Sequence, residues 1–160
     1  MIVAKKFVIN LLMKLNFAKF NARAFCAVGA TNMPWDLDEA VLRRLVKRIY
    51  VPLPDADSRM ALVLNLLRKQ GATLPQPQLQ RIVAMTEGYS GSDLAAVCQE
   101  AALGPIREIP PARLKTVKAE EVRPIQEKDF SEACRVIRPS VSPDSLQHFQ
   151  QWSAQYGVMR

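Results

Sequence analysis

Two adjacent arginines and a Thr-Asn pair are the side chains of this sequence best suited to phosphate chemistry. Arg43 and Arg44 end a short predicted helix, where two neighbouring guanidiniums cannot both lie against a core. A guanidinium is a planar fork of donors that suits a phosphoryl group whose charge spreads over several oxygens. Thr31 and Asn32 follow the apolar run 25–28, at the point where an open parallel sheet places its ligands. The pattern predicts a polar sensor and two phosphate-binding arginines, and the alternative is a solvated helix end that the helix dipole favours.

The elements around these residues follow from proline and capping signals. Pro34 prevents further strand pairing because it has no N–H to donate, and Asp36 with Glu39 is a capping-box pattern for the short helix. The run 48–51 predicts a second strand, which the prolines that follow it stop. The order is therefore strand, sensor, short helix, paired arginines, strand.

Beyond residue 54 apolar residues recur at three- and four-residue spacing, which predicts helices. A polar link that begins near Ile109 holds a strand-like piece at 122–125. The buried face predicted for the third helix comprises Leu94, Val97, Cys98, Ala101, Ala102 and Ile106. The first predicted helix begins at Asp57 and ends at Gly71, and the second begins at Pro75 and Pro77 and ends at Gly88. Ser90 with Asp93 begins the third, and Pro139 ends a fourth at about 128–137. Ser142-Pro143 begins a last helix that reaches about Tyr156.

The motifs Gly-Ala-Thr-Asn and Glu-Ala-Val-Leu-Arg-Arg resemble those of AAA ATPases, in the branch that contains spastin, katanin, fidgetin and the vacuolar-sorting ATPase. In that branch the asparagine of the first motif positions the attacking water, and the arginines of the second reach the ATP of a neighbouring subunit. The resemblance therefore implies a sensor role for Asn32 and finger roles for Arg43 and Arg44, the candidate catalytic residues. The family usually has arginine where this chain has Met33, which keeps bulk but lacks the charge.

A second motif of the same resemblance is Gly-Tyr-Ser-Gly-Ser-Asp-Leu at 88–94. A glycine at a helix start lets the backbone approach a planar ligand, and the N–H groups there are available as donors. In the family this turn lies against the adenine and ribose of ATP, which implies nucleotide binding by Gly91 and Ser92. Leu62 and Leu66 are candidate walls of the same pocket. A tight start of the helix is the simpler explanation of Gly91, and it is compatible with the functional one.

The resemblance covers roughly residues 24–158 and implies a mainly α fold. It predicts a strand–helix–strand remnant of an AAA α/β subdomain, followed by an all-α four-helix lid and a C-terminal helix. The predicted division is 1–23, an unmatched basic apolar segment; 24–54, the C-terminal end of the AAA α/β ATPase subdomain; 55–138, the helical lid subdomain; and 139–160, the C-terminal helix of the severing and vacuolar-sorting branch.

The net charge of +7 over 160 residues is concentrated at the start of the chain. The first 35 residues hold five basic residues and no acidic one, so a binder of nucleic acid or membrane would depend on them alone and is the least favoured function class. Residues 1–22 fit either an amphipathic targeting segment or foreign sequence joined to a truncated gene. The second is favoured because the resemblance begins only near Ala24. No apolar run is long enough to predict a membrane span.

Metal and nucleophile chemistry find little support in the sequence. Cys26, Cys98 and Cys134 lack metal-ligand spacing, and His148 is the only histidine. We therefore predict no metal site, buried thiols in a reducing compartment, and a surface or packing role for the histidine.

Two motifs that ATP hydrolysis requires are not found in these 160 residues, the Walker A phosphate loop and the Walker B strand with its acidic pair. Whether the chain itself is an enzyme is left open. The predicted function is the C-terminal part of an ATP-hydrolysing AAA ring protein of microtubule-severing type, which supplies sensor, arginine fingers and lid. The resemblance implies ATP and Mg in the complete module, a homo-hexamer, tubulin or microtubules as partner, and a cytoplasmic, cytoskeleton-associated location. The alternative is a non-catalytic ring-joining or protein-interaction module without nucleotide binding of its own.

We expect the 160-residue chain by itself to show no ATPase activity and to bind ATP weakly or not at all. A contact to the base without phosphate donors leaves most of the charge of the ligand unpaired. Isothermal titration calorimetry with ATP checks this expectation, and a micromolar dissociation constant would contradict it.

Overall fold

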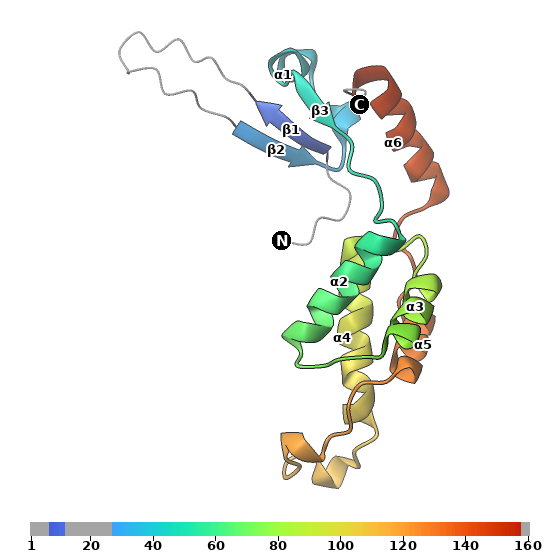
Figure 1. The fold of residues 1–160 in the computed structure, drawn as a ribbon. Helices are drawn as coiled ribbons and strands as arrows, with labels where there is room; N and C mark the ends of the chain where they lie inside the picture. The colour runs from blue at the N-terminus through green and yellow to red at the C-terminus, as the bar shows by residue number, and fades with distance from the viewer. Residues whose placement is uncertain (1–6, 12–26, 158–160) are drawn as a thin grey trace. The chain divides into compact units, whose positions relative to one another are not determined.

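The chain is described by a computed structural model over residues 7–11 and 27–157. These residues form two compact units. The helical unit comprises residues 53–141, and the mixed unit comprises the described residues of 5–52 together with 142–157. Figure 1 labels the helices and strands of both units.

The mixed unit contains a three-stranded sheet in the order β2-β1-β3. The strands are β1 (Phe7–Leu11), β2 (Ala27–Thr31) and β3 (Lys47–Ile49). β1 runs antiparallel to both neighbours, and its residues Phe7 and Leu11 pair with Thr31 and Ala27 of β2. β2 and β3 therefore run in the same direction with β1 between them. The described strands do not form the open parallel sheet expected from the sequence, because β1 between β2 and β3 runs the opposite way.

Two short helical elements follow β2. η1 (Pro34–Asp36) is a 3₁₀ turn with proline at its first position, and α1 (Glu39–Arg44) is a six-residue helix. Asp38 caps α1, because its Oδ1 accepts the N–H of Val41 at 2.7 Å. The predicted cap at Asp36 is wrong, since Pro34 starts a separate turn that already contains Asp36.

α6 (Pro143–Tyr156) supplies the apolar core of the mixed unit. Ser142 caps it as predicted, by accepting the N–H of Ser145. Phe149 and Trp152 are buried with Leu45, which follows α1. The partly buried residues around this core are Trp35, Leu37, Val41, Leu42 and Tyr50. The short elements of the mixed unit are therefore held by an aromatic face about a hundred residues away in the sequence.

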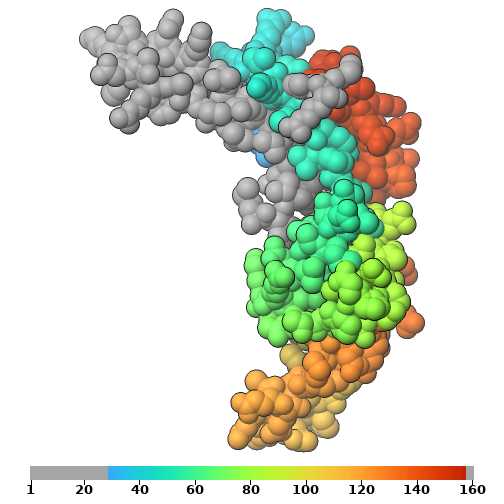
Figure 2. Space-filling view, viewed as in Figure 1, coloured from blue at the N-terminus to red at the C-terminus, as the bar shows by residue number. Residues whose placement is uncertain are grey.

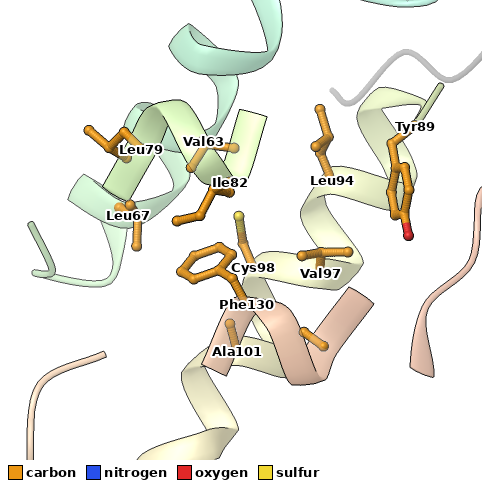
Figure 3. Packing of buried hydrophobic residues seen from close by; sticks show 11 residues of the cluster. Val63, Leu67, Leu79, Ile82, Tyr89, Leu94, Val97, Cys98, Ala101 and Phe130 are labelled. Atoms are coloured by element: carbon orange, nitrogen blue, oxygen red, sulfur yellow. The ribbon is translucent and has the colours of Figure 1, made fainter. Parts of the chain in front are cut away.

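The helical unit is built from α2 (Ala56–Lys69), α3 (Gln76–Met85), α4 (Gly91–Arg107) and α5 (Glu127–Val136). α2 packs against α3 and α4, and α5 packs against the same two helices, so the four helices close on one core. Figure 3 shows Phe130 of α5 reaching into that core. Its buried members are Val63, Leu67, Leu79, Ile82, Tyr89, Leu94, Val97, Cys98, Ala101, Phe130 and Ala133.

Three details of the helical unit differ from the sequence-based expectation. α2 is capped by Asp55 and not by Asp57, because Asp55 Oδ1 accepts the N–H of Ser58 at 2.8 Å. Residues 122–125 are not a strand, and the connection from α4 to α5 contains only two 3₁₀ turns, η2 (Pro111–Arg113) and η3 (Ala119–Glu121). Ile106 is 43% exposed, because the buried face of α4 continues through Ala101 to Pro105 and leaves the next position outside.

The long connection between α4 and α5 extends past the four-helix core. Figure 2 shows these residues, in orange shades, as one end of the helical unit. Close contact between α4 and α5 beside this connection depends on Gly104. A Cβ at this position would lie 2.5 Å from Oδ1 and 2.8 Å from Cγ of Asp129. The Asp129 carboxylate is held by hydrogen bonds from Arg123 and from the Gln126 N–H, so it cannot move aside at low cost.

We expect Gly104→Ala to lower the free energy of unfolding by roughly 1–3 kcal/mol, the usual cost of extra atoms in a filled site. The overlap with the Asp129 carboxylate outweighs the helix preference of alanine, which is about 0.5–1 kcal/mol over glycine. Urea unfolding followed by far-UV circular dichroism measures the change. Gln99→Ala, at an exposed position of the same helix, is the control and should change stability by no more than about 0.5 kcal/mol. Equal stability of the Gly104 variant and the wild type would show that α4 and α5 can separate freely.

Candidate functional site

The sensor candidate Asn32 directly follows β2 in the mixed unit. Its side chain is exposed. The preceding Thr31 accepts the N–H of Met33 through its Oγ1 at 3.0 Å, which turns the chain away from the strand. Pro34 is fully buried and begins η1, so the turn is fixed on both sides. Asn32 is therefore an exposed amide on an ordered turn at the end of a strand.

The predicted fingers Arg43 and Arg44 are the last two residues of α1. Arg43 pairs with Glu39 one turn earlier at 2.9 Å, with both side chains at least 80% exposed. Exposed pairs of this kind contribute only about 0.3–0.5 kcal/mol, so Arg43 can leave its partner easily. Arg44 is exposed and has no hydrogen-bond or ion-pair partner within the part of the chain that the structure describes. Both guanidiniums are thus available to an anion from outside the unit, and exposure alone also fits a solvated helix end.

Arg48 is a residue of this site that the sequence analysis missed. From β3 its guanidinium donates to the carbonyl oxygens of Leu42 at 2.6 Å, Leu45 at 3.1 Å and Tyr156 at 2.9 Å. Leu42 lies in the last turn of α1, Leu45 is its C-cap, and Tyr156 is the last residue of α6. The carbonyl groups at a helix C-terminus have no intrahelical partners and attract a cation. No sequence signal could have found this contact, because one of its partners lies 108 residues away.

In the helical unit, the turn before α4 contains a complete capping box. The Ser90 hydroxyl accepts the N–H of Asp93, and the Asp93 carboxylate accepts the N–H of Ser90. These two bonds occupy the N–H groups on either side of Gly91 and Ser92, whose own N–H groups stay available for another acceptor. Gly91 is buried and Ser92 is exposed. The geometry suits a ligand that lies against the backbone at this turn.

Asp93 also ties the turn to the segment before α6. Its Oδ2 accepts both the N–H and the hydroxyl of Ser140 at 3.2 Å. Burial alone would raise the pKa of the Asp93 carboxyl, but the hydrogen bonds from Ser90 and Ser140 outweigh burial and lower the pKa. Asp93 is therefore ionised at neutral pH and fixes the first turn of α4.

The predicted pocket walls Leu62 and Leu66 lie one turn apart on α2. Both are partly buried and pack against the core of the helical unit. The structure thus brings Leu62, Leu66, Gly91 and Ser92 into the helical unit, on two helices that pack together. It places Asn32, Arg43 and Arg44 in the mixed unit.

A second network missed by the sequence analysis centres on Arg123, between η3 and α5. Its guanidinium makes a two-point contact with Glu108 at 2.6 and 2.7 Å and another with the buried Asp129 at 2.7 and 2.8 Å. Lys128 forms a third ion pair of the network, with Glu108. Hydrogen bonds from Arg123 and Lys128 lower the pKa of Glu108 from 4.5 to about 2. Burial would raise the pKa of Asp129, but the Arg123 and Gln126 bonds outweigh it and lower the pKa. The network fixes both ends of the connection between α4 and α5.

The described residues offer little support for metal, cysteine or histidine chemistry. No three His, Cys, Asp or Glu side chains of the described residues are grouped so as to hold a metal ion. Cys98 is buried, and burial raises its pKa to about 12. Burial also raises the pKa of Cys134, while Cys26 lies outside the described residues. His148 stacks on Trp35 with ring centroids 4.2 Å apart, which is a packing role. Within residues 7–11 and 27–157, no helix is both long and apolar enough to cross a membrane.

Two protein families match parts of the chain. Residues 77–132 match the AAA+ lid domain family, and residues 108–157 match the Vps4 C terminal oligomerisation domain family. Rat spastin is 50% identical over 130 residues, which are 81% of this chain and 22% of spastin. Human fidgetin-like protein 1 is 45% identical over 81% of this chain and 19% of its own length. The chain therefore spans about a fifth of the length of these relatives.

Solved structures give the same assignment. The FIGL-1 AAA domain in complex with ADP matches with a TM-score of 0.76 and 40% identity, over 81% of this chain and 44% of that one. A structure described as "Structural Basis for Katanin Self-Assembly" matches with a TM-score of 0.67 and 32% identity, over 78% of this chain and 45% of that one. The chain carries the C-terminal part of an AAA ATPase module. Its relatives place that module in the microtubule-severing branch, with spastin, fidgetin-like proteins and katanin.

We expect Arg123→Met to lower the free energy of unfolding of the helical unit by about 1–3 kcal/mol at pH 7, because the buried carboxylate of Asp129 loses its charged partner. Both acids in the network have depressed pKa values, so their contribution is present above the unfolded pKa and is lost as pH falls through the folded one. For Glu108 that window runs from 4.5 down to about 2.

The difference between wild type and Arg123→Met should therefore shrink when urea unfolding is repeated at about pH 2. Arg113→Met is the matched control, because the ion pair of Arg113 with Glu121 lies on the same connection and is exposed on both sides. It should change stability by well under 1 kcal/mol at either pH. A difference for Arg123→Met that does not depend on pH would mean that packing of the side chain, and not its charge, stabilises the connection.

Proposed function

We propose that this chain supplies the sensor, the arginine fingers and the lid of an AAA ATPase ring of microtubule-severing type. In this proposal residues 24–54 end the α/β ATPase subdomain, residues 55–138 are the lid, and residues 139–160 are the C-terminal helix. Asn32 positions the attacking water, and Arg43 and Arg44 reach the ATP of a neighbouring subunit. The observation that carries the proposal is the exposed arginine pair at the end of α1, a helix anchored at both ends, in a chain homologous to AAA ATPases.

The chain fits a nucleotide on the base side only. Gly91 and Ser92 offer N–H groups that the capping box does not use, and Leu62 and Leu66 offer apolar surface for a base. The phosphates and Mg would be held by Walker motifs, which these 160 residues do not contain. The FIGL-1 AAA domain, which is similar to this chain, was solved with ADP, and this supports nucleotide use in the complete module.

The partners follow from the same relatives. Residues 108–157 match a family described as an oligomerisation domain, and the katanin structure concerns self-assembly. We therefore propose other AAA subunits as partners, in a homo-hexamer. Tubulin or microtubules are the proposed substrate, in the cytoplasm and in association with the cytoskeleton. Nucleic acid is not proposed as a partner.

One observation favours the alternative function, a ring-joining module that binds no nucleotide of its own. β1 occupies the position between β2 and β3 and runs antiparallel to both. Its last residue, Leu11, pairs with Ala27 at the start of β2, while Asn32 follows the end of β2. A phosphate loop that followed β1 would therefore lie at the end of the strands opposite to the end where Asn32 lies. With β1 in this position, the arginine pair can be given to a neighbour, but a phosphate site beside Asn32 cannot be formed from β1.

The arginine pair provides the test of the proposed function. In a complete AAA subunit that carries this segment, Arg44→Ala should leave ATP binding nearly intact and abolish ring-stimulated hydrolysis. Fingers supplied by a neighbour contribute a factor of roughly 10³–10⁵ in rate. Arg43→Ala should act in the same direction, whereas Lys47→Ala, at an exposed lysine close by, should have a milder effect.

Mixed rings distinguish a finger from a solvated helix end. When wild-type and Arg44→Ala subunits are combined, each variant deprives the site of its neighbour and not its own site. The steady-state ATPase rate should therefore fall more steeply than the fraction of wild-type subunits. A fall in simple proportion to that fraction would reinstate the solvated helix end as the explanation of the pair.

A further inference from the structure

We propose that Arg48 is a positioning residue that sets the direction of the arginine pair by joining the C-terminal ends of α1 and α6. This inference rests on the proposed function of Arg43 and Arg44. The two α1 carbonyls that Arg48 binds belong to Leu42 and Leu45, the residues immediately before and after the pair. The backbone that carries the two arginines is thus held on both sides by one guanidinium.

α1 needs such a contact because of its length. A helix of six residues is far below the roughly 12–15 residues at which isolated helices become even marginally stable. None of its own residues is fully buried, and at its C-terminus the carbonyl of Val41 is already used by the N–H of Leu45. Arg48 binds two of the other carbonyls there, with the planar fork that lysine lacks. Without it, the last turn of α1 could fray, and the arginine pair would lose a fixed direction.

The third bond of Arg48 makes α6 part of the same arrangement. α6 is anchored by the buried Phe149 and Trp152, and its last residue, Tyr156, accepts from Nη1 of Arg48. The carbonyl is in reach because the helix ends at this point. Gly157 caps it, and a Cβ at Gly157 would lie 2.5 Å from the carbonyl oxygen of Ser153. The C-terminal ends of α1 and α6 therefore both bind the guanidinium of Arg48. A change at the end of one helix should for this reason alter the position of the other.

The first experiment measures steady-state kinetics of the complete AAA subunit described above with Arg48→Met. We expect kcat to fall about 10- to 100-fold, the usual effect of misplacing a catalytic group by about 1 Å, while KM for ATP changes less than twofold. Arg48→Lys should recover only part of the rate, because one ammonium cannot reach three carbonyl oxygens. In mixed rings the loss should again exceed simple dilution, since the misplaced fingers serve the neighbour. Lys47→Met, on the same strand, is the control with the smaller effect.

A second variant reaches the same contact from α6. Gly157→Ala touches neither the arginine pair nor the aromatic core, but it must shift the end of α6 where Arg48 binds. It should lower kcat in the same direction, and the double variant with Arg48→Met should lose little more than Arg48→Met alone. Fully additive losses would contradict a shared contact.

Amide hydrogen exchange of the 160-residue chain keeps the inference testable if the variant rings fail to assemble. Arg48→Met should accelerate exchange in residues 41–45 and leave α2 to α5 unchanged. Unchanged exchange in α1 would overturn the inference, and so would a wild-type kcat for Arg48→Met where Arg44→Ala abolishes hydrolysis. If Arg44→Ala also leaves hydrolysis intact, the finger role itself is wrong, and this result is distinct from a failure of the positioning role alone.

Discussion

The terminal backbone groups of a helix have no partner inside the helix, and this constraint shapes the mixed unit. α1 is so short that its ends make up most of its length. Asp38 accepts from its first turn, and Arg48 donates to its last. The same guanidinium donates to the carbonyl of Tyr156 at the end of α6, so one side chain binds terminal carbonyl groups of two helices. These contacts hold the backbone on both sides of the exposed Arg43 and Arg44.

In the helical unit the corresponding groups are met by carboxylates. Asp93 closes the capping box of α4 and also holds Ser140. Asp129 accepts the N–H of Gln126 before the first turn of α5 and also binds Arg123. Each carboxylate is buried and keeps its charge because several donors surround it. This arrangement leaves the N–H groups of Gly91 and Ser92 unused at the turn where we propose that a nucleotide binds. The capping box that fixes the first turn of α4 thus also leaves the N–H groups of Gly91 and Ser92 available as donors.

The proposed roles are divided between the two units. The proposed sensor and the arginine pair belong to the mixed unit, and the proposed base-side turn belongs to the helical unit. Among the residues that the structure describes, neither unit holds a full set of groups for phosphoryl transfer, which needs positioning, charge stabilisation and phosphate binding at one atom. The proposed chemistry is therefore a property of an assembly. The resemblance of residues 108–157 to an oligomerisation domain is consistent with that conclusion.

The sequence by itself determined the helices of the helical unit, the caps at Ser90 and Ser142, and the AAA resemblance, because these depend on periodicity and on signals a few residues apart. It placed two caps two residues away from their true positions, at Asp36 and Asp57, since neighbouring aspartates offer equivalent signals and only the backbone decides between them. It did not determine the antiparallel β1, the contact between Gly104 and Asp129, or the networks of Arg48 and Arg123. Those contacts join residues up to 108 positions apart. The partners of Arg48 are backbone carbonyl groups, which every residue type carries, whereas the ion-pair partners of Arg123 are carboxylates that folding brings together. Only the tertiary structure decides which carbonyl a given arginine reaches, because the chain must first fold for the ends of α1 and α6 to meet.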